Sequence, residues 1–295
     1  MPKTPKAYNL LDFMRDYPSD DACLDKLCEM RYGREPVCAS CGKETKYHRL
    51  KSRKAYSCQW CGTHVYPCAG TPFEKSRTSL QKWFYAMFLF TTTRHGVPAK
   101  ELERQLGVTY KTAWRMGHII RELMENIGIE KLIGEVEIDE SYVGGYRPGA
   151  YGRSTKNKTI VLGMKQRGGD MVAMVIPDVK ASTIQPLVKQ YVARGTTVHT
   201  DEWWGYRYLR YAGFDHRTVR HGAGEYDRDG SNTNAIENFW ARLKLSIRGT
   251  HIHVSSKHLQ KYVTEFAFRY NYRNMPDRMF AVLLASLGSP AAVRR

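Results

Sequence analysis

The chain has 295 residues and a formal net charge of +17, because 46 lysines and arginines outnumber 29 aspartates and glutamates. Hydrophobic residues make up 42% and charged residues 25%, a globular composition that excludes an intrinsically disordered chain. No apolar run reaches the ~18 residues that a membrane span needs, so a transmembrane protein is excluded, and the charge indicates a polyanionic partner.

Residues 1–34 are predicted to form a helical segment without net charge, since they carry six bases and six acids. The first residues, MPKTPKAYNL, contain no apolar signal segment, so we expect a cytoplasmic protein whose seven cysteines stay reduced. Cys23 and Cys28 lie in the helical stretch DDACLDKLCEMRYG and are expected to be small core residues.

Residues 35–75 contain two Cys-x-x-Cys pairs, Cys38 with Cys41 and Cys58 with Cys61, separated by sixteen residues. This spacing is typical of a tetrahedral zinc site with four cysteine ligands. The basic segment between the pairs is expected to form a β-hairpin, the usual shape of a zinc ribbon. Because four thiolates fill the coordination shell, a single structural zinc ion is predicted. A disulfide framework is the alternative, and a reducing compartment disfavours it.

Residues 76–127 are predicted to form a helix-turn-helix module that binds DNA. Ser79 is a favourable N-cap for an apolar helix over 79–95. Apolar residues then mark two further helices on either side of Gly107, and Thr109 and Lys111 open the second of them. A recognition helix contacts base edges and phosphates at this position. A plain helical hairpin is the alternative.

Residues 128–295 are predicted to form an α/β domain of the ribonuclease H-like class. Three β-like runs come first: GEVEIDESYVGG, KTIVLGMKQR and DMVAMVIPDV. A helix over 181–195, a strand that ends at Asp201, a further short strand in HRTVRH and a long amphipathic helix carrying Glu237 follow. This order of elements is typical of that fold class, with a basic helix at the C-terminal end.

Three acids of this domain are candidates for catalysis. Asp139 and Asp201 are expected on adjacent strands, with Glu237 facing them from the long helix. Mg²⁺ prefers carboxylate oxygens, and two such ions support phosphodiester cleavage and transfer. We therefore predict two Mg²⁺ (or Mn²⁺) ions, bridged by Asp139 and completed by Asp201 and Glu237. Glu140 and Glu202 adjoin the two aspartates, and the strand register decides which member of each pair faces the site.

The positive charge lies on both sides of this acidic stretch. Residues 35–126 and residues 241–295 each have a net charge of +8, whereas residues 127–240 have only +1. This distribution is typical of two DNA-binding segments on either side of a site that needs carboxylates. The alternative is a surface of charged residues that only keeps the protein soluble. DNA contacts are predicted for Thr109, Lys111, Arg153, Lys156, Lys158, Lys244, Arg248 and Lys257.

Two further segments have competing interpretations. The loop that contains Arg153, Lys156 and Lys158 is either a basic loop that follows a DNA backbone or an ordinary hairpin connection. Trp203 and Trp204, just after Asp201, either stack on a distorted DNA end or pack in the wall of the site.

The ordered blocks GEVEIDESYVGG, VHTDEWWGY, TNAIENFWARLK and GTHIHVSSKHLQKYVTEFAFRYNYR resemble those of DDE transposases of bacterial insertion sequences. Within these, the chain is most similar to the ISXO-like group, which has an N-terminal zinc ribbon, and the likeness runs from about residue 11 to residue 281. The resemblance implies that Asp139, Asp201 and Glu237 form the metal-binding triad and that Lys244, two helical turns after Glu237, lies near bound DNA.

The chain departs from this group at one motif. The group often has His-Thr-Asn before the glutamate, where this chain has Asn232-Thr233-Asn234. Some relatives replace the third acid with Asn or His, which makes Asn234 and Asn238 fallback candidates, but this chain keeps Glu237.

We therefore expect a bacterial, nucleoid-associated DNA transposase. It would bind the terminal inverted repeats of an insertion sequence, cut the ends with Mg²⁺ and join the 3′-hydroxyls to target DNA, as a homodimer or higher homo-oligomer. A non-catalytic DNA-binding regulator and a ribonuclease H-type nuclease acting on RNA or hybrids are the alternatives. Retention of all three acids favours the enzyme over the regulator.

Overall fold

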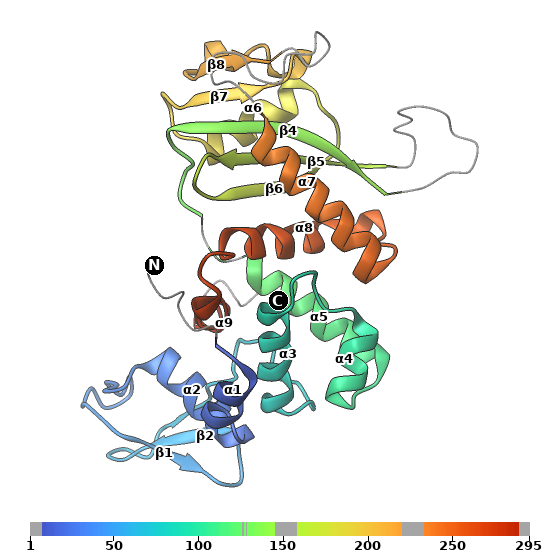
Figure 1. The fold of residues 1–295 in the computed structure, drawn as a ribbon. Coiled ribbons are helices and arrows are strands. Elements are labelled where there is room, and N and C mark those ends of the chain that lie inside the picture. Colours follow the sequence, from blue (N-terminus) through green and yellow to red (C-terminus); the bar gives the residue numbers. More distant parts are fainter. Residues whose placement is uncertain (1–7, 126, 128, 145–157, 220–232, 289–295) are drawn as a thin grey trace, which may run out of the picture. The chain divides into compact units, whose positions relative to one another are not determined.

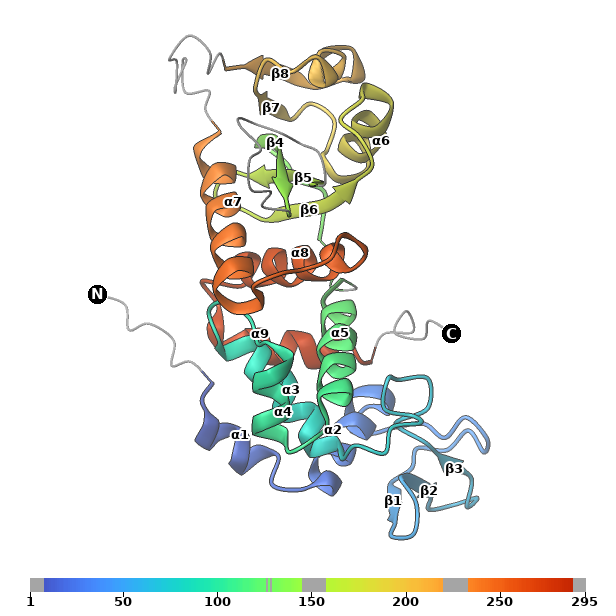
Figure 2. The same ribbon diagram turned by 90° about the vertical axis from the view of Figure 1, so that its right-hand side faces the viewer.

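The computed structural model describes residues 8–125, 127, 129–144, 158–219 and 233–288, and its contacts divide the chain into two compact units (Figures 1 and 2). The first unit comprises residues 1–93, 97–127 and 275–295, and the second comprises residues 94–96 and 128–274. In the part of the chain that the structure describes, no helix is both long and apolar enough to span a bilayer. Arg153 and Lys156 lie outside the described residues.

The first unit begins with two short helices and a small sheet. The elements are α1 (Leu10–Asp16), α2 (Asp20–Tyr32), β1 (Tyr47–Leu50), β2 (Ala55–Cys58) and β3 (His64–Val65). β1 and β2 pair in antiparallel register, which confirms the hairpin expected between the two cysteine pairs. Cys23 and Cys28 are buried in α2, as expected of core residues.

Three helices follow: α3 (Leu80–Thr92), α4 (Ala99–Leu106) and α5 (Tyr110–Glu125). The Ser79 hydroxyl accepts a hydrogen bond from the Lys82 amide at 3.3 Å, so α3 begins at its predicted cap. Gly107 ends α4, and α4 packs against α5. The two helices predicted on either side of Gly107 are present, with Leu102, Leu106 and Ala113 buried.

The last helix, α9 (Pro276–Ala285), belongs to the first unit. The ring of Phe280 packs edge-on against Phe13, Tyr17 and Phe88, with centroids 5.9–6.0 Å apart. The sequence-based division instead kept residues 128–295 together as one domain. The difference arises because the apolar face of α9 is buried against aromatic residues of α1 and α3, which lie about 190 to 270 residues earlier in the chain.

The second unit is built on a five-stranded sheet with the order β6-β5-β4-β7-β8. Its strands are β4 (Glu135–Val143), β5 (Thr159–Gln166), β6 (Met171–Ile176), β7 (Thr197–Thr200) and β8 (Asp215–Thr218). β4, β5 and β6 pair antiparallel, whereas β7 and β8 run parallel to β4. These directions and this order are those of a ribonuclease H-like sheet, so the predicted fold class is confirmed.

Helices cover both faces of this sheet (Figures 1 and 2). They are α6 (Ala181–Tyr191) on one face, and α7 (Asn234–Ser246) and α8 (Ser256–Asn271) on the other. Two 3₁₀ turns, η1 (Trp204–Tyr206) and η2 (Leu209–Ala212), follow β7, and a π-helical turn, η4 (Ile247–His251), follows α7.

The side chains of β4 alternate between the two faces. Val136 and Ile138 join the hydrophobic core beneath α6, whereas Val143 joins the core beneath α7 and α8. Gly163 of β5 lies directly opposite Asp139, on the α7 side. A Cβ atom at Gly163 would come within 2.6 Å of the Trp240 ring. The glycine is therefore needed for α7 to lie this close to the sheet.

We expect Gly163→Ala to lower the free energy of unfolding by about 1–3 kcal/mol, because the added methyl group overpacks against Trp240 and Met171. Gly249→Ala is the matched control: its Cβ would meet no atom within 4 Å, and its φ is not left-handed. Urea denaturation followed by circular dichroism measures both. Equal stability of the two variants would contradict the close packing of α7.

Candidate functional site

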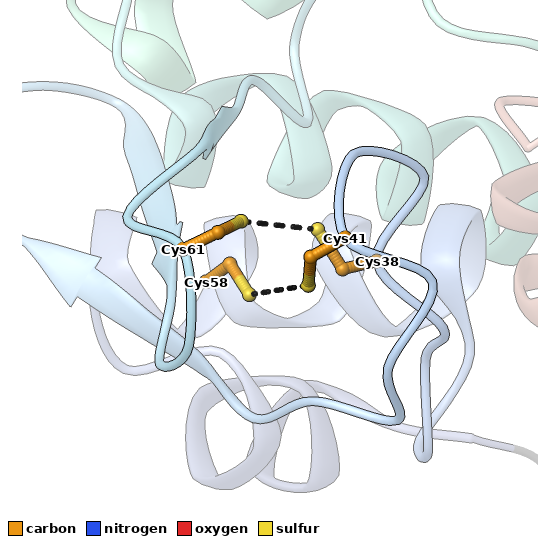
Figure 3. A group of neighbouring side chains, drawn as sticks. All are labelled: Cys38, Cys41, Cys58 and Cys61. Carbon is orange, nitrogen blue, oxygen red and sulfur yellow. Dashed lines mark hydrogen bonds between the residues drawn. The ribbon is translucent and has the colours of Figure 1, made fainter.

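The four predicted zinc ligands come together in the first unit, from two turns that face each other (Figure 3). All four Sγ atoms lie within 4.8 Å of one another, with 3.7 Å between Cys38 and Cys61 and 3.9 Å between Cys41 and Cys58. A tetrahedral ion with Zn–S bonds of about 2.3 Å requires sulfur atoms about 3.8 Å apart. The cluster therefore fits one zinc ion.

The surroundings of two of these sulfur atoms, those of Cys58 and Cys61, favour thiolates, since hydrogen bonds with Thr63 lower the pKa of Cys61. At Cys41 the Lys43 amide lowers the pKa, but burial and the neighbouring thiols outweigh it and raise that pKa to about 11. Burial raises the pKa of Cys58, but the Thr45 hydroxyl and the amides of Cys61 and Trp60 outweigh it and lower that pKa to about 6. Gly42 and Gly62 follow the two pairs with φ values of 70° and 71°, which only glycine adopts readily. Because the thiolate is the form that binds metal, both features suit a structural zinc site.

The two predicted catalytic aspartates belong to neighbouring strand segments of the second unit: Asp139 lies in β4, and Asp201 directly follows the last residue of β7. β4 and β7 pair from Glu135↔Thr197 to Glu137↔His199, and the same register continued by two residues places Asp201 level with Asp139. The pKa of Asp139 is raised to about 7, chiefly by burial and also by repulsion from the carboxylates of Glu140 and Asp201. The structure thus brings these two aspartates close enough to interact.

Glu140 and Glu202, the acidic neighbours of the two aspartates, have different surroundings. The Tyr206 hydroxyl donates a hydrogen bond to Glu140 Oε2 at 2.6 Å, from the 3₁₀ turn on the α6 side of the sheet. Glu202 is exposed. Asp139, by contrast, faces α7, on the opposite side of the sheet from Glu140.

Helix α7 carries the third predicted acid and also contacts the first. The Trp240 indole N–H donates to Asp139 Oδ2 at 2.9 Å. Glu237 lies three residues earlier, and its carboxylate accepts a hydrogen bond from the Thr233 hydroxyl at 3.1 Å. Among the residues that the structure describes, no three carboxylates cluster as tightly as the four thiolates do. The fallback candidates Asn234 and Asn238 are exposed on α7.

A further acid, Glu137, holds the start of α7, and the sequence analysis missed this residue. Its Oε2 accepts hydrogen bonds from the main-chain amides of Ala235 at 2.9 Å and Ile236 at 3.0 Å, and its Oε1 accepts one from Arg167. The side chain is 1% exposed, and Thr233 provides α7 with no side-chain cap. A carboxylate is favourable at a helix N-terminus. Its position two residues before Asp139, on the same strand face, is the signal that would have found it.

The predicted DNA contacts fall into separate groups. Burial lowers the pKa of Lys244, and Asp139 opposes that shift, which places the ammonium beside the acidic site. Lys158 and Arg248 lie near enough to repel Lys244. In the first unit, Thr109 and Lys111 are exposed at the start of α5. Lys257 is exposed in the first turn of α8.

We expect the purified protein to hold one zinc ion per chain, and Cys58→Ser to lower this content because it removes one of four ligands. Cys68→Ser is the matched control, since Cys68 is a buried cysteine outside the cluster. Elemental analysis measures the metal, and circular dichroism reports the fold. Loss of zinc from both variants alike, or from neither, would disprove the four-cysteine site.

We expect Glu137→Gln to destabilise the protein by about 1–3 kcal/mol, because a buried charged acceptor for two helix amides and Arg167 is lost. The matched control is Glu135→Gln, whose carboxylate also pairs with Arg167 but is half exposed, and surface ion pairs contribute little. Chemical denaturation compares the two. A control variant as unstable as Glu137→Gln would show that the helix contact contributes nothing.

Comparisons with known proteins agree with this architecture. Residues 131–271 match the ISXO2-like transposase domain, and residues 18–64 match the transposase zinc-ribbon domain. An uncharacterized protein in transposable element ISH50 of Halobacterium salinarum is 27% identical over 290 residues, covering 90% of this chain and 95% of that protein. An uncharacterized transposase-like protein of Haemophilus influenzae is 26% identical over 98 residues, covering 33% of this chain and 78% of that protein.

Among solved structures, the catalytic core domain of BIV integrase aligns with a TM-score of 0.32 and 16% identity, over 46% of this chain and 82% of that one. The fold assignment rests on the strand order and directions of the sheet. The two domain matches confirm the resemblance seen in the sequence: this chain joins a transposase zinc-ribbon domain to an ISXO2-like transposase domain.

Proposed function

We propose that this protein is a DNA transposase that binds the terminal inverted repeats of an insertion sequence, cuts its ends and transfers them to target DNA. One observation carries the proposal: Asp139 lies in β4, Asp201 directly follows the neighbouring strand β7, and the helix that carries Glu237 packs onto Asp139. The match of residues 131–271 to a transposase domain supports it.

Asp139, Asp201 and Glu237 would hold two Mg²⁺ or Mn²⁺ ions, with Asp139 as the shared ligand. The donor set fits, because carboxylate oxygens are hard ligands. Burial and the repulsion between neighbouring carboxylates raise the pKa of Asp139, and a nearby dication relieves such repulsion. When bound, such ions activate an attacking oxygen and stabilise the leaving oxygen of a phosphodiester.

The remaining residues of the site position these groups. Trp240 orients the Asp139 carboxylate, and Glu137 fixes the first turn of α7, on which Glu237 lies. Lys244, beside Asp139, would neutralise a DNA phosphate. The attacking groups are water and then a 3′-hydroxyl, so the reaction requires no serine or tyrosine nucleophile.

The zinc ribbon and the helical module would recognise the element ends. Thr109 and Lys111 stand exposed at the start of α5, where a recognition helix meets base edges and phosphates. The net charge of +8 over residues 35–126 favours a DNA backbone as the partner. Joining two ends in one event would require at least a homodimer.

We expect Asp139→Asn and Asp201→Asn to slow Mg²⁺-dependent cleavage of DNA carrying the element ends by at least about a hundredfold, because each removes a charge that the reaction needs. Glu202→Gln, the exposed neighbour of Asp201, is the matched control and should cleave as the wild type does. Gel analysis of end-labelled DNA measures the rate.

Three outcomes would contradict the proposal. Wild type and Asp139→Asn could be equally inert on cognate ends, which would favour a DNA-binding regulator. Cleavage of an RNA strand but not of DNA ends would favour a ribonuclease. Loss of activity in Glu202→Gln, with Asp201→Asn active, would reverse the assignment at that pair.

A further inference from the structure

The segment directly after Asp201 exposes large aromatic side chains. Trp203 is 47% exposed, Trp204 67%, Tyr208 48% and Tyr211 78%. Together with two arginines they form what we term the aromatic–arginine surface: Trp203, Trp204, Arg207, Tyr208, Arg210 and Tyr211. Of the two interpretations that the sequence left open for the tryptophans, packing in a wall does not account for this exposure.

Buried residues of the same segment hold this surface in place. A Cβ atom at Gly205 would lie 2.5 Å from the Val179 carbonyl oxygen, so the backbone packs directly on its neighbour. Tyr206 and Leu209 are fully buried in the core beneath α6, and the Tyr206 hydroxyl is bonded to Glu140. The two 3₁₀ turns therefore present their outward side chains from a fixed base, and these rings lose little freedom when they bind.

The two arginines lie over exposed rings. The Arg207 guanidinium is 4.6 Å from the centre of the Trp204 ring, and that of Arg210 is 5.5 Å from the centre of the Tyr211 ring. Residues 203–212 contain these two bases and no acid. The surface also adjoins the acidic site, since Asp201 Oδ1 accepts a hydrogen bond from the Trp203 amide at 3.0 Å.

We propose that the aromatic–arginine surface binds unpaired DNA bases at a strand end beside Asp201, an inference that takes DNA as the substrate from the proposed function. Aromatic rings stack on the faces of bases, and arginines contact the phosphates between them. In a duplex those faces are already stacked on neighbouring bases, so the rings select bases that are unpaired.

A second copy of this chain is the competing occupant, because exposed aromatic residues and arginines are also typical of protein interfaces. A symmetric dimer through this surface would gather Arg207 and Arg210 of both copies in one interface, and residues 203–212 offer no acid to pair with them. A polyanion supplies that negative charge, and the chain as a whole has a net charge of +17.

The test measures binding without cleavage. Zinc-loaded full-length protein is titrated, in buffer lacking Mg²⁺, into fluorescein-labelled duplexes that are either blunt or carry a five-nucleotide 3′ overhang, and anisotropy gives both affinities. Trp204→Ala and Tyr211→Ala remove rings, whereas Trp204→Phe and Tyr211→Phe keep an aromatic ring at each position. Leu245→Ala is the matched control, since Leu245 is an exposed apolar residue of the same unit.

We expect the wild type to prefer the overhang duplex, and each alanine variant to reduce that preference about fivefold or more, as the loss of one stacked base predicts. Affinity for the blunt duplex should stay unchanged, and the phenylalanine variants and Leu245→Ala should keep the preference.

The proposal is overturned if the alanine variants bind both duplexes as the wild type does, or lose affinity for both equally. It is also overturned if sedimentation shows that they dissociate an oligomer while the overhang preference remains. Because no cleavage is needed, a protein that prefers overhangs but fails to cut DNA with Mg²⁺ would disprove the proposed activity and leave this surface assigned.

Discussion

The packing of α7 against β4 is the contact on which the acidic site depends. Two carboxylates from one face of the strand bind the helix: Glu137 accepts from main-chain amides of the first turn, and Asp139 accepts from the indole of Trp240. Burying carboxylates is costly unless they are hydrogen-bonded, so strand register and helix position are fixed together. Gly163 makes this contact possible by leaving the space that the indole occupies.

Several acids lie close to this contact. The carboxylates of Asp139, Glu140 and Asp201 repel one another, and Asp139 also attracts the ammonium of Lys244. The zinc ribbon is stabilised in a different way. Its small three-stranded sheet has little hydrophobic core, so a metal held by the four thiolates contributes to its folding stability. In the proposed function, hard carboxylates would hold Mg²⁺ and soft thiolates would hold zinc, at two separate sites of one chain.

The aromatic–arginine surface adjoins the acidic site at Asp201 and adds stacking rings that the three acids alone do not predict. Tyr206 lies in the base of this surface, where it is buried on the α6 side of the sheet, and its hydroxyl donates a hydrogen bond to the Glu140 carboxylate. This one side chain therefore holds Glu140 on the side away from α7 and also anchors the segment that carries the exposed rings.

Local spacing along the chain was enough to predict several features. Two cysteine pairs on tight turns specified the zinc site, and strand alternation together with helical periodicity led to the sheet and to α7. Four other features became visible only in the folded chain: Glu137 caps α7, Trp240 donates a hydrogen bond to Asp139, α9 belongs to the first unit, and Trp204 is exposed. The contacts of Glu137, Trp240 and α9 join residues about a hundred or more positions apart, and the exposure of Trp204 depends on how its whole segment packs, so no local pattern encodes them.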